Sequence, residues 1–188
     1  MQTQAKKYIT LYTEANPNPN SMKFVANYML VPEGTTFDFP DRESAQEAPI
    51  AQALFEFSYV RRVFLMNNFI TITKDEQADW FEIVPELKKF IKTYLEEEKP
   101  LLSRNLVQNF ETETNSQDSE VVRKIKNILE EYVRPAVETD GGAIHFRSFE
   151  EGVVKVQLQG SCSGCPSSTL TLKAGIENLL KRMVPEVT

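Results

Sequence analysis

The alternation of apolar and polar side chains predicts β-strands in the first half of the chain. Residues Tyr8–Tyr12 alternate in this way, and Met22–Val25 begins a second extended run after a turn-rich stretch of asparagine and proline. Two longer apolar runs, Val60–Met66 and Phe69–Thr73, are separated only by an Asn-Asn pair, and asparagine tolerates the positive φ angles of a tight turn. We therefore predict two early strands followed by a β-hairpin.

Two helices are predicted in the same half. Pro49–Phe55 suits a short helix, because proline is well tolerated in a first helical turn. Asp79 can cap a longer helix, whose apolar residues recur at helical spacing. These apolar residues are Phe81, Ile83, Val84, Leu87, Phe90, Ile91 and Leu95.

A change in composition marks the end of this first domain. From Glu96 to Glu120 there are seven acidic residues and only two basic ones, and the hydrophobic pattern weakens. We therefore expect an α+β domain over residues 1–96 and an acidic linker over residues 97–117. Apolar residues interrupt the linker, and they fit either a short helix that packs back on one domain, which is the simpler explanation, or a motif for a partner. They are Leu101, Leu102, Leu106, Val107 and Phe110.

The remaining residues, 118–188, predict a second α+β domain that begins and ends with a helix. Asp118 or Ser119 can cap the first helix, which we expect to stop near Pro135. The last helix starts at Pro166 and presents an apolar stripe to a core. The stripe consists of Leu172, Ile176, Leu179, Leu180 and Met183.

Two strands are predicted between these helices. Asp140-Gly141-Gly142 forms a turn, because glycine reaches backbone conformations closed to other residues. Ile144–Arg147 and Val154–Gln159 then alternate apolar with polar side chains, on either side of a turn at Glu150-Glu151-Gly152. The domain therefore has the order helix, strand, strand, cysteine loop, helix.

Charge and hydropathy exclude several classes of protein. With 41% hydrophobic residues among 188, the chain can bury folded cores and is not a disordered protein. A formal net charge of −6 argues against wholesale nucleic-acid binding, which needs a basic surface. No apolar run approaches the roughly 18 residues of a membrane span. The first residues enter a strand pattern almost at once and leave no room for a signal or transit peptide, so we expect a cytoplasmic protein.

Both cysteines of the chain, Cys162 and Cys165, lie in one short loop. Two thiolates at this spacing can bind one metal centre from one side but cannot complete it. A cubane iron–sulfur cluster takes about four cysteine ligands, and tetrahedral zinc takes about four ligands of any kind. The remaining ligands must come from elsewhere, and a second copy of the chain is the simplest source.

The residues around the cysteines favour an anionic group. Cys165 precedes Pro166 at the predicted start of a helix, where unpaired amides and the helix dipole favour a thiolate. Gly160 and Gly164 would let the backbone approach a bound inorganic core closely. We infer a site for a thiolate-bound, anionic cofactor.

Two other functions fit the same cysteines. A dithiol/disulfide oxidoreductase also uses a C-x-x-C at a helix start, although a thioredoxin-like fold needs further strands after that helix. A four-cysteine zinc site that bridges a dimer, with two cysteines from each of two chains, has the same spacing requirement. His145, the single histidine, is expected to be exposed on its strand, and Asp140 is expected to shape a turn.

Several motifs of the second half occur together in one known family. They are Asp140-Gly141-Gly142, the strand Val153–Gln159, the run Gly160–Leu170, Leu172-Lys173 and Gly175-Ile176-Glu177. With these motifs, residues 118–188 resemble the C-terminal domain of the NifU and Nfu iron–sulfur scaffold family.

A second group of motifs, in the first half, points the same way. They are Pro17–Asn20 with Lys23-Phe24, Ala51–Phe55, Val60–Thr73 and Asp79-Trp80. This segment looks like the N-terminal domain that accompanies the cysteine domain in Nfu proteins.

The resemblance implies a carrier and not an enzyme. It implies that each subunit offers Cys162 and Cys165 and that a homodimer holds one [4Fe–4S] cluster between its subunits. The cluster would come from an upstream donor and pass by ligand exchange to apo target proteins, with the N-terminal domain helping to recognise targets. Without the extra cysteine-bearing domains of full-length NifU or an organellar leader, the chain is expected to be a bacterial-type Nfu protein of the cytoplasm.

Overall fold

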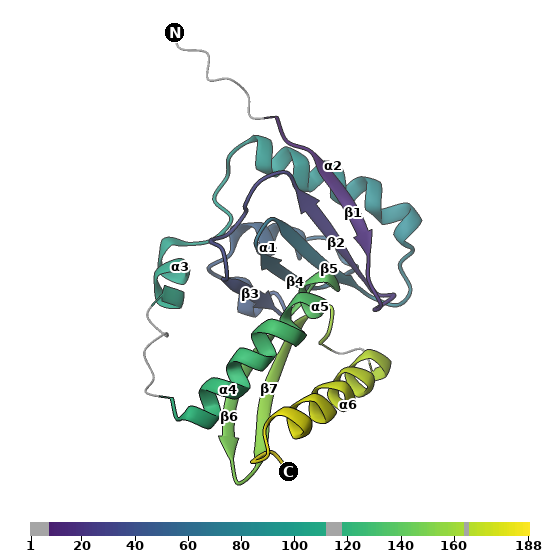
Figure 1. The fold of residues 1–188 in the computed structure, drawn as a ribbon. Coiled ribbons are helices and arrows are strands. Elements are labelled where there is room, and N and C mark those ends of the chain that lie inside the picture. Colours follow the sequence, from purple (N-terminus) through teal and green to yellow (C-terminus); the bar gives the residue numbers. More distant parts are fainter. Residues whose placement is uncertain (1–7, 112–117, 164–165) are drawn as a thin grey trace.

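The computed structural model describes residues 8–111, 118–163 and 166–188, with the backbone alone at 109–111 and 166–168. Figure 1 shows two α+β parts, which confirms the predicted fold class. The first domain consists of β1 Leu11–Ala15, β2 Ser21–Ala26, β3 Thr36–Phe39, a 3-10 turn Glu43–Ala45, α1 Pro49–Leu54, β4 Val60–Met66, β5 Phe69–Lys74, α2 Trp80–Glu96 and α3 Arg104–Glu111. The second consists of α4 Glu120–Ile128, a π-helical segment Leu129–Val133, α5 Arg134–Thr139, β6 Gly142–Glu150, β7 Val153–Gly160 and α6 Pro166–Met183.

The first domain is built on an antiparallel five-stranded sheet. Its strand order is β1-β2-β5-β4-β3. The predicted hairpin is confirmed: Met66 pairs with Phe69, and Asn67 in the turn has a φ of 46°. The sequence did not reveal β3, because four residues that end just before Pro40 are too short to show a periodic pattern.

Both faces of this sheet are buried. One face packs under α1 and α2 through a core that includes Ile70 and Ile72. The opposite face carries an apolar cluster shared with Ala143 of the second domain. Its members from the first domain are Val25, Phe64, Met66 and Phe69. Each such side chain contributes roughly 1.5–3 kcal/mol when it is buried, so the second domain covers a surface that is costly to expose.

The segment after α2 returns to the first domain. Leu101, Leu102, Leu106 and Val107 pack against its core, and Ser103 N–H donates to the Glu47 carbonyl at 2.7 Å. A short helix that packs back on the first domain, the simpler of the two alternatives, is therefore what the structure has as far as residue 107. The side chain of Phe110 and residues 112–117 lie outside the described residues, and the domain limits 1–96, 97–117 and 118–188 stay predictions.

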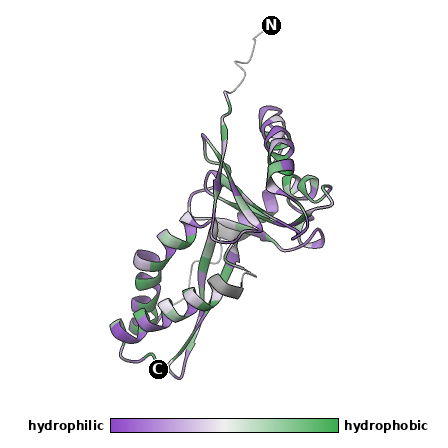
Figure 2. Cartoon of the chain, turned by 90° about the vertical axis from the view of Figure 1, so that its right-hand side faces the viewer, coloured by the Kyte–Doolittle hydropathy of each residue, from purple (hydrophilic) through white to green (hydrophobic). Residues whose placement is uncertain are grey.

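The second domain consists of a β-hairpin flanked by helices. Strands β6 and β7 are antiparallel, with an irregularity between Phe146 and Ser148. The predicted turn is present, with φ of 49° at Glu151 and 82° at Gly152. Seen from the side, the helices carry both hydrophilic and hydrophobic residues, as amphipathic elements do (Figure 2). None of the helices in the described part of the chain is long and apolar enough to cross a bilayer.

The prediction that the first helix of this domain stops near Pro135 is wrong. The helical path continues to Thr139, because the π-helical segment Leu129–Val133 widens the turn just before the proline. Pro135 then occupies the first turn of α5, where its missing N–H leaves no bond unmade. The helix therefore ends directly before Asp140 and the glycine turn.

Candidate functional site

Cys162 lies two residues after the end of β7, at the end of the second domain that contacts the first domain. Its side chain is 6% exposed and belongs to the apolar core formed with α4, α5 and α6. Cys165 and Gly164 lie outside the described residues. The structure thus places one of the two predicted ligands, and the pairing of the two cysteines stays a prediction.

Two glycines close to Cys162 have no room for a side chain. A Cβ added at Gly142 would lie 2.5 Å from the Gln159 carbonyl oxygen and 3.0 Å from Cys162 Sγ. A Cβ at Gly160, where φ is +67°, would lie 2.7 Å from the Gly141 carbonyl oxygen. The turn before β6 and the loop after β7 are therefore in direct backbone contact beside the thiol.

Hydrogen bonds tie the cysteine loop to its neighbours. The Ser161 N–H donates to the Gly141 carbonyl at 3.3 Å, and the Ser161 hydroxyl donates to the Asp140 carbonyl. The Ser163 N–H donates to the Gly160 carbonyl at 3.1 Å. The backbone on the amino side of Cys162 is therefore fixed by contacts that do not involve a bound group.

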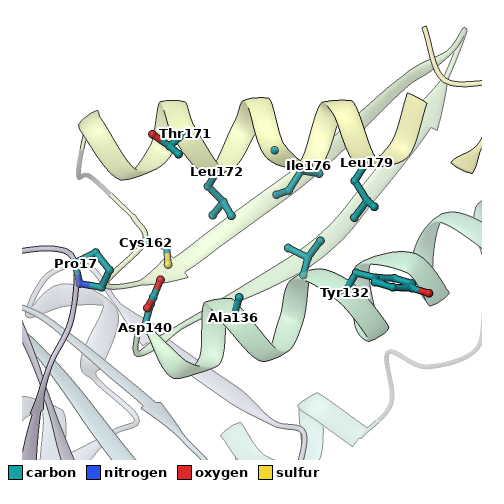
Figure 3. Close-up of a pocket in the computed structure, with 11 residues that line it drawn as sticks. Pro17, Tyr132, Ala136, Asp140, Cys162, Thr171, Leu172, Ile176 and Leu179 are labelled. Carbon is teal, nitrogen blue, oxygen red and sulfur yellow. The ribbon is translucent and has the colours of Figure 1, made fainter. Parts of the chain in front are cut away.

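A pocket of about 600 Å³ opens beside Cys162. Figure 3 shows Cys162, Asp140 and Pro17 at one end, with side chains of α6 facing those of the α4–α5 helical segment along its length. Its apolar walls are formed by Pro17, Val133, Ala136, Leu172, Ile176 and Leu179. A sulfur donor at the end of such a pocket can bind a soft metal centre while the apolar walls limit competing water ligands.

Asp140 is the acidic residue among the described residues that line the pocket. Burial raises the pKa of its carboxyl above the ordinary value, and the positive charge of Lys23 partly offsets the rise. Its predicted turn-forming role fits its position at the end of α5. Within the described residues, no group of three or more His, Cys, Asp or Glu side chains is arranged to hold a metal.

His145 is not the exposed strand residue that the sequence predicted. It is half-buried between the two domains, and its Nε2 lies 2.9 Å from both Thr36 Oγ1 and Gln159 Oε1. Alternation along β6 correctly puts it on the polar face. At His145 that face meets Thr36 on β3 of the first domain, a contact that local sequence does not reveal.

Burial lowers the pKa of His145 below its ordinary value of 6.5, and the charges of Arg147 and Arg134 lower it further. The bond to Gln159 and the charge of Glu130 oppose this shift. Between the folded and unfolded pKa values only the unfolded chain takes up the proton, so stability is lost as the pH falls below about 6.5.

We therefore expect the free energy of unfolding to decrease as the pH is lowered through about 6.5, the ordinary pKa of histidine. His145→Gln, which keeps a polar side chain without a titrating group, should reduce this slope. Urea unfolding of the metal-free protein at several pH values measures it. Identical slopes for both proteins would contradict the assignment.

The structure adds two residues that sequence reasoning missed. Asn18 Nδ2 donates to the Ser161 carbonyl at 3.0 Å, and Thr71 Oγ1 donates to the Gly141 carbonyl at 2.7 Å. The available signal was weak: Asn18 lies in a turn-rich segment, and Thr71 is a polar residue within an apolar run.

Comparisons with known proteins give a consistent result. A family model described as "Scaffold protein Nfu/NifU N terminal" matches residues 11–99, and one described as "NifU-like domain" matches residues 125–188. A protein described as "NFU1 iron-sulfur cluster scaffold homolog, mitochondrial" from Drosophila persimilis is 42% identical over 97% of this chain. The protein of the same description from Drosophila willistoni is 42% identical over 100% of it. The solution structure of a NifU-like protein from Saccharomyces cerevisiae aligns over 55% of this chain and 91% of its own, with 24% identity and a TM-score of 0.46.

The comparisons overturn the expected location. The chain spans 64% of the length of each of these two Drosophila relatives, and both are named as mitochondrial proteins. The prediction of a bacterial-type cytoplasmic protein is therefore wrong. It depended on the first residues of the sequence, and these carry no information on compartment when the relatives are longer than the chain.

Proposed function

Because the chain belongs to the Nfu/NifU scaffold family through both of its halves, we propose that it carries an iron–sulfur cluster on Cys162 and Cys165 and delivers it to apo target proteins. The main support is the position of Cys162 at the end of an apolar pocket, in a loop packed on Gly142 and Gly160. The names of its relatives suggest that it acts in mitochondria.

The proposed cargo is a [4Fe–4S] cluster shared by two subunits. One chain has two cysteines, and a cubane takes about four thiolates. A homodimer that places two C-x-x-C loops face to face supplies this number. The cluster is then part of the interface.

Ligand exchange is the proposed mechanism of delivery. Thiolates of an apo target replace the scaffold thiolates one at a time, and only two iron–sulfur bonds per chain have to break. An upstream donor loads the cluster in the same way. The protein holds and transfers cargo without converting a substrate, so it is a carrier and not an enzyme.

Anaerobic reconstitution with ferrous iron and sulfide tests the proposal. We expect a brown protein with about four irons and four sulfides per two chains. Light scattering should show a mass of one chain before loading and two chains after it, because a ligand that bridges two chains favours the dimer. A cluster retained by a single chain would contradict the shared site.

The same preparation decides between the alternatives, neither of which gains support from the comparisons. A colourless dimer with one zinc per two chains would establish the four-cysteine zinc site instead. Catalytic reduction of a disulfide substrate by protein that takes up no iron would establish the dithiol/disulfide oxidoreductase.

A further inference from the structure

The first domain contacts the backbone on both sides of the cysteine loop. Thr71 on β5 donates to the carbonyl of Gly141, in the turn before β6, and this hydrogen bond is buried. Asn18 donates to the carbonyl of Ser161, the residue immediately before Cys162, and this bond is also buried. Two main-chain groups that border Cys162 thus depend on side chains of the other domain.

Glycine makes this close approach possible. A Cβ at Gly141 would lie 2.8 Å from Thr71 Oγ1, and a Cβ at Gly160 would lie 2.9 Å from the ring of Phe64. Phe64 itself is fully buried in the apolar cluster shared between the domains. The glycines beside Cys162 therefore accommodate the sheet of the first domain as well as the turn geometry.

The turn that carries Asn18 is held by hydrogen bonds within the first domain, independently of its contact with the cysteine loop. Asn18 Oδ1 accepts the N–H of Asn20 at 3.0 Å, and the Ser21 hydroxyl donates to Asn16 Oδ1 at 2.9 Å. Pro17 of this turn lines the pocket beside Cys162 (Figure 3). The first domain therefore contributes one residue to the lining of the candidate site.

We propose that Asn18 and Thr71 are positioning residues of the cluster site, which hold the backbone around Cys162 from the first domain and slow release of the cluster. This inference rests on the proposed function. A thiolate leaves its iron more readily when its loop can move. The hydrogen bonds from Asn18 and Thr71 resist that movement. The first domain therefore influences the rate at which the cluster is released.

Two substitutions remove the contacts with little change in shape. Thr71→Val keeps the size of the side chain and loses the hydroxyl. Asn18→Asp keeps the acceptor for the Asn20 N–H, but its carboxylate cannot donate to the Ser161 carbonyl. Loss of each hydrogen bond should speed cluster loss to an iron chelator roughly 2- to 10-fold.

Two matched variants serve as controls. Thr73→Val makes the same change two residues along the same face of β5, where the side chain forms no hydrogen bond with the described residues. It should release the cluster at the wild-type rate. Thr71→Ser loses a methyl group but retains the hydroxyl, and it should release the cluster as slowly as the wild type. If Thr71 acted only through packing, this variant would release the cluster faster. Equal release rates for wild type, Thr71→Val and Asn18→Asp would overturn the inference.

Hydrogen exchange of the apo protein separates this inference from the proposed function. The Ser161 amide, which donates to the Gly141 carbonyl, should exchange faster in Thr71→Val than in Thr73→Val. Faster exchange in a protein that takes up no iron would leave the domain contact standing and remove the proposed function. Wild-type exchange in Thr71→Val would overturn the positioning role whatever the cargo.

Discussion

Replacement of Cys162 by serine is expected to reduce bound iron after reconstitution to the background level. Each dimer would lose two of its four thiolates, and a serine hydroxyl is a hard, neutral oxygen in place of a soft sulfur anion. Cys165→Ser should have the same effect. The measurement is iron and sulfide per chain after removal of excess reagents, together with the loss of the brown colour.

Two further variants separate ligand loss from misfolding. Cys162 is buried in an apolar core, so a serine there also destabilises the domain, whereas Cys162→Ala keeps the site apolar. Cys162→Ala should retain the far-ultraviolet circular dichroism of the wild type and still bind no cluster. Ser163→Ala, which changes the residue after Cys162 and leaves both cysteines, should load normally. Full loading of Cys162→Ala would exclude Cys162 as a ligand.

Gly142→Ala is the second substitution with a large expected effect. The backbone of Gly142 has no positive φ, so an alanine meets no conformational penalty there. The added methyl carbon would lie 2.5 Å from the Gln159 carbonyl oxygen and 3.0 Å from Cys162 Sγ. The ends of β6 and β7 must separate, and overpacking of this kind costs roughly 1–3 kcal/mol.

We expect this variant to unfold at a lower urea concentration and to lose its cluster faster than wild type. Gly175→Ala is the matched control, because its added Cβ would have no atom within 4 Å apart from the adjacent residues and backbone of its own helix. In a helix this change is neutral or stabilises by up to about 1 kcal/mol. Wild-type stability of Gly142→Ala would contradict the close packing of the cysteine loop.

Local sequence was sufficient for most elements of the fold. Asp79 caps α2 by accepting the Phe81 N–H at 2.8 Å, and the hairpin around Asn67 lies where the pattern predicts it. These features depend on residues close together in the chain. The C-x-x-C spacing likewise needed no structure, although only Cys162 of the pair is among the described residues.

Two kinds of feature were missed. The continuation of the helix past Pro135 depends on a local π-helical segment, which hydrophobic periodicity does not reveal. The burial of His145 depends on a distant contact with Thr36 of the other domain. The apolar run in β4 is a further case. Two-sided burial explains why Val63–Met66 are all 0% exposed, but periodicity cannot tell which segment covers the second face.

The sequence by itself determined most of the α+β elements and the spacing of the two cysteines, since these depend on residue type and position in the chain. Only the tertiary structure decided that the first domain reaches the cysteine loop through Asn18 and Thr71. The acceptors are main-chain carbonyls at Gly141 and Ser161, and a carbonyl is present at every position of a sequence. Which carbonyl meets which side chain is fixed by the fold alone.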